Sequence, residues 1–100
     1  MHRGTTPTHL FKLPKEMASI SPSKIYVTYA QDKKVVLEKD INSLFFEDGV
    51  ISVTLTQEET LKFKDGDTEI QIRIKDVNDS AYTSFIISVP VHRILKEGEI

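Results

Sequence analysis

Histidines are the side chains of this chain best suited to acid–base or metal chemistry, and all three stand far apart. His2, His9 and His92 fall at the start, in an early strand candidate and in the last strand candidate. No two of them have the i, i+2 or i, i+4 spacing that would place both on one face of a strand or helix. Surface positions are the usual place for histidines of this kind. The sequence therefore predicts no histidine-based catalysis and no bound metal.

A second candidate for metal chemistry lies between two strand candidates. Asp76, Asn78 and Ser80 occupy alternate positions, as the first ligands of a calcium-binding loop do. The sixth position is Ala81, where such loops need glycine, and the twelfth is Ile87, where they need a bidentate glutamate. We therefore interpret this segment as an ordinary turn.

Nucleophilic and phosphate-binding chemistry have equally little support. The chain has no cysteine, which excludes disulfides, thiolate metal sites and cysteine nucleophiles. Ser52, Ser84 and Ser88 lie within strand candidates, away from the sharp strand-to-helix turn that presents a nucleophilic serine. Four glycines are too few and too scattered for a glycine-rich phosphate loop. The prediction is a protein that is not an enzyme and binds no cofactor.

Composition limits the class of partner. The chain has 100 residues, 39% hydrophobic and 28% charged, with 13 basic residues interleaved among 15 acidic ones. Nucleic-acid binders cluster their basic residues, so we expect no nucleic-acid partner. No apolar run reaches the length of about 20 residues that a membrane helix needs, so we expect no membrane partner. The length suits a single domain over residues 1–100.

Two segments alternate apolar and polar residues, which is typical of strands with one buried face. They are Val50 to Thr56, with Ile51, Val53 and Leu55 inward, and Glu69 to Lys75, with Ile70, Ile72 and Ile74 inward. Other strand candidates are His9 to Leu13, Lys24 to Ala30, Val35 to Lys39, Ser43 to Val50 and Tyr82 to about Leu95.

Turn and helix signals separate these strands. Gln31 to Lys34 predicts a hairpin turn, and Asp48-Gly49 predicts a tight turn because both central residues of a type I′ turn need positive φ. Thr56-Gln57-Glu58-Glu59 matches a capping box, so a helical turn or two is expected from Gln57 to about Phe63. Residues 15 to 23 are expected to be a connector.

The last strand candidate has two contrasting faces. Phe85, Ile87, Val89 and Val91 are expected on the core face, which leaves Ile86 pointing outward. Pro90 has no amide hydrogen and therefore indicates an edge position or a bulge.

About seven short strands with regular turn signals predict an all-β fold, an antiparallel β-sandwich of the immunoglobulin-like type with one short helical turn. An OB-type barrel is the alternative, although its helix is usually longer.

Four segments carry a resemblance to known proteins: Arg3 to Leu13, Ile25 to Gln31, Leu55 to Leu61 and Val89 to Gly98. With these segments the chain resembles a group of small uncharacterised proteins found in phages and prophages of Gram-positive bacteria, over nearly its whole length. The Gly-Thr-x-Pro opening and the strand-rich body are also distantly similar to the immunoglobulin-like N-terminal module of phage upper-baseplate proteins.

The resemblance implies a structural module of the virion or tail that works by protein–protein contact, with other tail or baseplate proteins or with itself. It implies a location in the virion, or in the bacterial cytoplasm before assembly. We expect the contact surface on the outer face around Tyr26, Ile86 and His92, together with the Pro90 edge. Residues 1 to 8 and 93 to 100 are expected either to fray or to add as a strand to a neighbouring protein.

Two other functions stay open. A carbohydrate-binding sandwich would present a planar row of exposed aromatic residues, for which Tyr26 and Phe45 are the candidates. A single-stranded nucleic-acid binder on an OB-like barrel would bind in a salt-dependent way, and the acidic balance argues against it.

Overall fold

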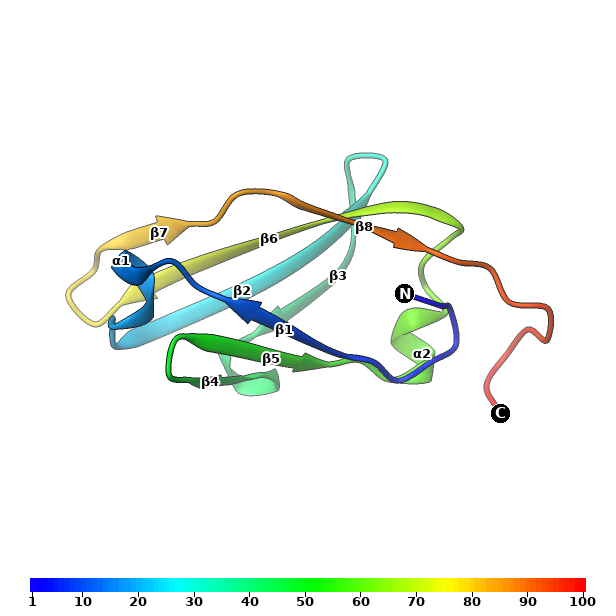
Figure 1. Cartoon of the computed structure of the whole chain (residues 1–100), viewed down its shortest axis with the longest axis horizontal. Helices are drawn as coiled ribbons and strands as arrows, with labels where there is room; N and C mark the ends of the chain where they lie inside the picture. The colour runs from blue at the N-terminus through cyan, green and yellow to red at the C-terminus, as the bar shows by residue number, and fades with distance from the viewer.

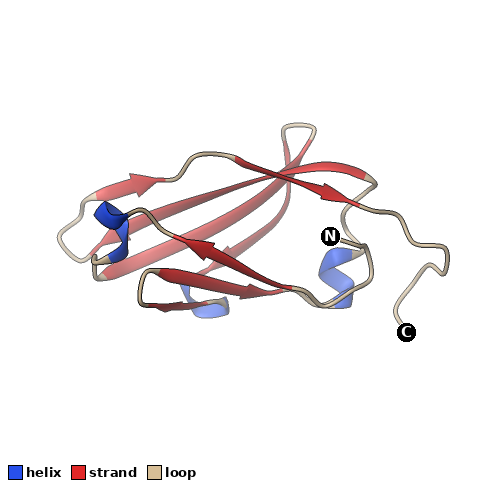
Figure 2. Ribbon diagram, viewed as in Figure 1, coloured by secondary structure: helices blue, strands red, loops and turns tan.

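The chain folds into two antiparallel sheets that pack face to face (Figure 1 and Figure 2). The computed structural model describes residues 1–100. One sheet has three strands in the order β1-β5-β4, and the other has five, in the order β3-β2-β6-β7 with β8 also paired to β6. The elements are β1 (Thr8–Lys12), α1 (Lys15–Ala18), β2 (Pro22–Gln31), β3 (Lys34–Asp40), the 3-10 helix η1 (Ile41–Ser43), β4 (Phe45–Glu47), β5 (Val50–Thr54), α2 (Gln57–Thr60), β6 (Gly66–Asp76), β7 (Ala81–Thr83) and β8 (Ile87–Val91). The predicted antiparallel sandwich is confirmed. The alternative, an OB-type barrel, is wrong because the strands form two separate sheets.

Both predicted hairpins are present. The turn between β2 and β3 has Asp32 and Lys33 at φ 51° and 63°, and the turn between β4 and β5 has Asp48 and Gly49 at φ 51° and 74°. Two consecutive residues at positive φ are the mark of a type I′ turn, whose twist matches that of the flanking strands. The local turn signals in the sequence therefore place both hairpins correctly.

The predicted capping box at the start of α2 is also present. The hydroxyl of Thr56 accepts a hydrogen bond from the Glu59 N–H, and the Glu59 carboxylate accepts one from the Thr56 N–H. The helix is shorter than predicted and ends at Thr60 instead of near Phe63. After Thr60 the bonds tighten to i→i+3, with the N–H of Phe63 donating to the carbonyl of Thr60.

The segment between β1 and β2 differs from the expected connector. Residues 15–18 form the short helix α1, and β2 already begins at Pro22. Burial of Met17 in the core explains why this piece is helical despite its length, because packing rather than local propensity holds it.

The prediction of one long final strand is wrong. The structure has two short strands, β7 and β8, which pair opposite ends of β6 with registers that differ by one residue. Ser84 lies at the break, where its hydroxyl accepts the Ile72 N–H and its own N–H donates to the Ile72 carbonyl. Between β7 and β8 the chain has one residue more than continuous pairing with β6 would need. The inward side chains therefore change from even-numbered residues in β7 to odd-numbered residues in β8. Phe85, predicted on the core face, is therefore 91% exposed.

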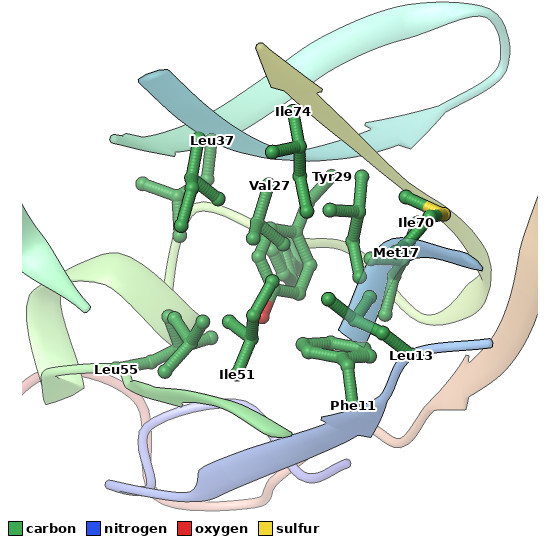
Figure 3. Close-up of a cluster of buried hydrophobic side chains, with 14 of the residues drawn as sticks. Phe11, Leu13, Met17, Val27, Tyr29, Leu37, Ile51, Leu55, Ile70 and Ile74 are labelled. Atoms are coloured by element: carbon green, nitrogen blue, oxygen red, sulfur yellow. The ribbon is translucent and has the colours of Figure 1, made fainter. Parts of the chain in front are cut away.

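Inward side chains from both sheets form one core. Figure 3 shows Phe11 and Leu13 from the side of the three-stranded sheet directed towards the side chains of the opposite sheet. The inward residues of both alternating segments are buried as predicted. The core residues are Phe11, Leu13, Met17, Ile25, Val27, Tyr29, Leu37, Ile51, Val53, Leu55, Phe63, Ile70, Ile72, Ile74 and Val91.

The two long sides of the sandwich are built differently. On one side η1 carries the chain from β3 directly to β4, so the two sheets are joined there. On the other side β1 is the last strand of its sheet, and it faces β7 and β8, which form the edge of the larger sheet. Because β7 and β8 share one edge of β6, the larger sheet is one strand wider than the smaller one.

Candidate partner-binding surfaces

The histidines do not converge, although two of them meet. His2 and His92, far apart in the sequence, have ring centroids 5.0 Å apart because residues 1–3 lie along the end of β8. His9 is separate and pairs with the Tyr29 hydroxyl through Nδ1 at 2.8 Å. No group of three or more histidine, aspartate or glutamate residues is placed to hold a metal ion.

The Asp76 loop is stabilised by hydrogen bonds between the Asp76 side chain and the backbone of the same loop. The carboxylate of Asp76 accepts hydrogen bonds from the N–H groups of Asn78 and Ser80, each at 2.9 Å. This is the pattern by which aspartate stabilises a turn. The structure thus agrees with the interpretation of this segment as a turn.

The two ends of the chain are tied to the fold through Arg3. Its guanidinium donates to the carbonyls of Phe63 and Leu61, and its Nη1 donates to both carboxylate oxygens of Glu97 at 2.5 and 2.7 Å. The backbone of residues 1–3 also pairs with β8, where the His92 N–H donates to the Met1 carbonyl. Residues 1–3 thus pair with the end of β8 in their own chain, which differs from both expectations for this segment, fraying and addition to a neighbouring protein.

Tyr26 and Ile86 lie on the outer face of the larger sheet, as predicted. Tyr26 is paired in register with Arg73 of β6, and its side chain is 39% exposed. Ile86 is 58% exposed and lines a shallow hollow with Thr28 and the same Arg73. On the other side of Tyr26, Lys24 and Arg73 line a second hollow. Tyr26 and Ile86 therefore border one continuous area.

Pro90 and His92 lie away from the area around Tyr26 and Ile86. Pro90 is paired with Asp67, six residues along β6 from the Arg73 that faces Tyr26, which corresponds to about 20 Å. Pro90 occupies the outer edge of β8, where its carbonyl accepts the Met1 amino group at 2.8 Å. Its missing N–H thus faces away from β6, as predicted for an edge proline. The four predicted contact residues form two groups rather than one patch, and their role in binding stays a prediction.

Exposed aromatic residues do not make a row. Tyr26 belongs to the larger sheet, whereas Phe45, which is 79% exposed, belongs to β4 of the smaller one. Phe85 is exposed at the break between β7 and β8. The planar aromatic platform expected of a carbohydrate-binding sandwich is therefore not formed by these residues.

An apolar groove that the sequence does not reveal runs along the open side of the sandwich, between β1 and β8. Its two adjoining parts have volumes of about 420 and 370 Å³ and share Lys12, Pro14, Ser84 and Ile87. The floor is made by inward side chains of β6, chiefly Ile70 and Ile72. Other lining residues are Thr8, His9, Leu10, Phe11, Leu13, Glu16, Met17, Tyr82, Thr83, Phe85 and Val89.

The backbone of β1 has a free edge along this groove. Leu13 donates its N–H to Gly49, and Pro7 accepts from Leu55, so the odd-numbered residues of this segment bond to β5. In an antiparallel pair the residues between them point their N–H and C=O groups the other way. Thr8, Leu10 and Lys12 therefore offer three donors and three acceptors to the groove.

Burial of His9 beside the groove affects its protonation. Burial, and next the positive charge of the amino terminus, lower the pKa of His9 below the usual 6.5. Burial, and next the charge of Glu59, raise the pKa of its partner Tyr29, which stays a neutral phenol. The pair is therefore uncharged at neutral pH, in keeping with its apolar surroundings.

This pair predicts a pH dependence of stability. Unfolded His9 takes up a proton near pH 6.5, whereas folded His9 does so only at lower pH. Protonation therefore favours the unfolded state, and the free energy of unfolding should fall as the pH drops below 6.5. Urea titrations between pH 7.5 and 5 measure this. His9→Gln, which does not titrate, should show a shallower fall, and an identical fall in the variant would contradict the assignment.

Glu59 connects the capping box to the rest of the fold. Burial acts to raise the pKa of Glu59, but the Lys39 ammonium at 2.7 Å and the hydrogen bonds from Thr56 outweigh it and hold the pKa below its usual value. Because Lys39 is on β3, this ion pair fixes α2 to the larger sheet.

Comparison with known proteins yields one distant structural similarity. Over 94% of its length the chain resembles the V domain of amphioxus IgVJ-C2, covering 97% of that chain, with a TM-score of 0.41 and 11% sequence identity. No protein-family model and no curated protein matches the sequence. No helix of the structure has the length and apolar character needed to cross a membrane.

Proposed function

We propose that this chain is a non-catalytic protein-interaction module of a phage or prophage virion or tail. The observation that carries the proposal is the open side of the sandwich, where a free strand edge borders an apolar groove. Unpaired edges are sites at which other chains add to a sheet, so folded proteins normally cover or protect them. The phage setting is supported by the resemblance of the four sequence segments, and it implies a location in the virion, or in the bacterial cytoplasm before assembly.

The lining of the groove favours contact over chemistry. It consists mainly of aliphatic and aromatic side chains, and its charged members, Lys12 and Glu16, are both at the exposed rim. Burial of such apolar surface stabilises a complex by about 25 cal/mol per Å² before the costs of association. The partner is expected to be another tail or baseplate protein.

Particle association tests the proposal. An epitope-tagged chain is expressed in the host during phage production, and particles are separated on a density gradient. The proposal predicts that the chain sediments with intact particles and stays there after a high-salt wash. A chain found only in the unsedimented fraction would overturn the phage assignment, whatever its binding properties in isolation.

The outer face around Tyr26 and Ile86 gives a separate prediction. Ile86→Lys should reduce incorporation into particles at least about threefold, because an unpaired charge in a buried contact is costly. Val77→Lys is the matched control, since Val77 is 67% exposed in the turn after β6. Quantitative immunoblotting of purified particles measures both. Normal incorporation of the Ile86 variant would remove this face from the contact surface.

A further inference from the structure

We propose that the groove beside β1 binds one extended strand of a partner protein, which adds to the free edge of β1 and becomes the fourth strand of the smaller sheet. The inference deepens the proposed interaction function by naming the site and the form of the partner. It rests on the backbone groups of β1, the unequal widths of the sheets and the charge at the rim.

The other sheet edges are protected, whereas that of β1 is not. β3 carries four charged residues, Lys34, Glu38, Lys39 and Asp40, and its pairing with β2 contains a bulge. β4 and β7 have only three residues each. β8 has Pro90 at its edge and is covered there by residues 1–3. Charges, bulges, short length and proline are the usual defences against strand addition.

The edge of β1 has one charge in five residues. Thr8, Leu10 and Lys12 present their N–H and C=O groups to the groove, and the side chain of Leu10 is 68% exposed. A strand lying here would satisfy backbone groups of β1 in an ordinary antiparallel or parallel ladder. Leu10 is an apolar residue on the outward-facing side of β1, a position whose meaning follows only from the order of the strands.

The width of the sheets shows where the added strand would lie. The groove is lined by β1 on one side and by Ile87 and Val89 of β8 on the other. The position for a fourth strand of the smaller sheet therefore lies next to β1 and opposite β8. Ile87 is on the inward face yet 41% exposed, because no strand of the smaller sheet lies over it. Alternate side chains of an added strand would cover Ile87 and complete the core.

A second copy of the chain does not fit this position. Pairing β1 with its own copy about a two-fold axis would continue the smaller sheet and bring β8 of the copy beneath β1. That space is already filled by Ile70 and Ile72 of β6. The geometry therefore favours a single extended segment over a symmetric dimer.

Charge at the rim specifies the partner further. Two charged residues, Lys12 on β1 and Glu16 on α1, are exposed at the rim and are in no ion pair, and Lys12 is the one on the strand edge itself. An added strand with apolar residues facing the groove and an acidic residue on its outer face would neutralise Lys12. The partner segment is expected to alternate apolar and polar residues and to carry an acidic side chain.

A tethered strand tests the proposal on the whole chain. The C-terminus is extended by a flexible Gly/Ser linker of about 15 residues, which spans about 20 Å on average, and by the probe strand Thr-Val-Thr-Val-Asp-Val-Thr. The tether raises the local concentration of the probe to roughly millimolar. We expect at least tenfold slower amide exchange at Thr8, Leu10 and Lys12, measured by NMR against the same chain with the linker alone.

Leu10→Pro in the tethered protein is the key variant. Proline removes a donor that faces the groove and leaves the bonds to β5 intact, so the variant should fold and lose the added protection at Thr8 and Lys12. Ser52→Thr, on the central strand of the same sheet, should retain it.

Three results would overturn the proposal. The first is unchanged amide exchange in the tethered protein, and the second is protection that maps to β3 or β4. The third is protection of β1 that appears without the probe and grows with protein concentration, which would indicate self-association. If the tethered probe protects the β1 edge but the chain does not associate with particles, the strand-binding site is supported and only the phage assignment is wrong.

Discussion

Replacing Gly49 with alanine should lower the free energy of unfolding by about 2–4 kcal/mol. Gly49 lies at φ +74°, where a Cβ atom adds strain of roughly 1 kcal/mol or more. That Cβ would also stand 2.7 Å from the Cβ of Ala18, and overpacking of this kind costs roughly 1–3 kcal/mol. Urea unfolding followed by circular dichroism measures the change.

Gly98→Ala separates strain from the clash. Gly98 has a similar positive φ, 86°, but a Cβ at this position would have no neighbouring atom within 4 Å. Its variant should show the smaller effect. Equal losses in the two variants would show that contact between the β4–β5 turn and α1 contributes little to stability.

Gln31→Leu should cost about 2–3 kcal/mol. Gln31 is only 5% exposed, and its amide group donates to the Lys64 carbonyl at 2.8 Å and accepts from the Lys64 N–H at 3.0 Å. Leucine fills a similar volume but leaves both of these partly buried backbone groups without protein partners, and each such loss costs about 1 kcal/mol or slightly more, the lower part of the range for buried groups. The same denaturation experiment measures the loss.

The matched control is Gln71→Leu. Gln71 is partly exposed and makes a single hydrogen bond, to the Ser84 carbonyl at 3.1 Å. We expect a loss below about 1 kcal/mol, because water can replace that bond. A loss at Gln31 no larger than at Gln71 would contradict the role assigned to the Gln31–Lys64 pair.

Features set by neighbouring residues could be predicted from the sequence. Alternation places the inward faces of β5 and β6, Asp48-Gly49 places a hairpin, and Thr56 with Glu59 places the start of α2. Each depends on contacts within a few residues. The all-β sandwich follows from combining these local signals.

Features set by distant residues could not be predicted in this way. The break between β7 and β8 depends on Ser84 bonding to Ile72, twelve residues away. The covering of β8 by residues 1–3 depends on contacts across almost the whole chain. The groove depends on how many strands each sheet has, which local patterns do not encode. Alternation puts Leu10 on the outward side of its strand, but the meaning of that position follows only from the sheet order.

Amide hydrogen exchange in the isolated chain shows directly whether the edge of β1 is free. Residue-by-residue NMR is expected to show fast exchange at Thr8, Leu10 and Lys12, whose N–H groups face the groove, and slow exchange at His9 and Phe11, whose N–H groups bond to β5. Equal protection of all five residues would contradict a free β1 edge, because it would mean that the edge is already paired.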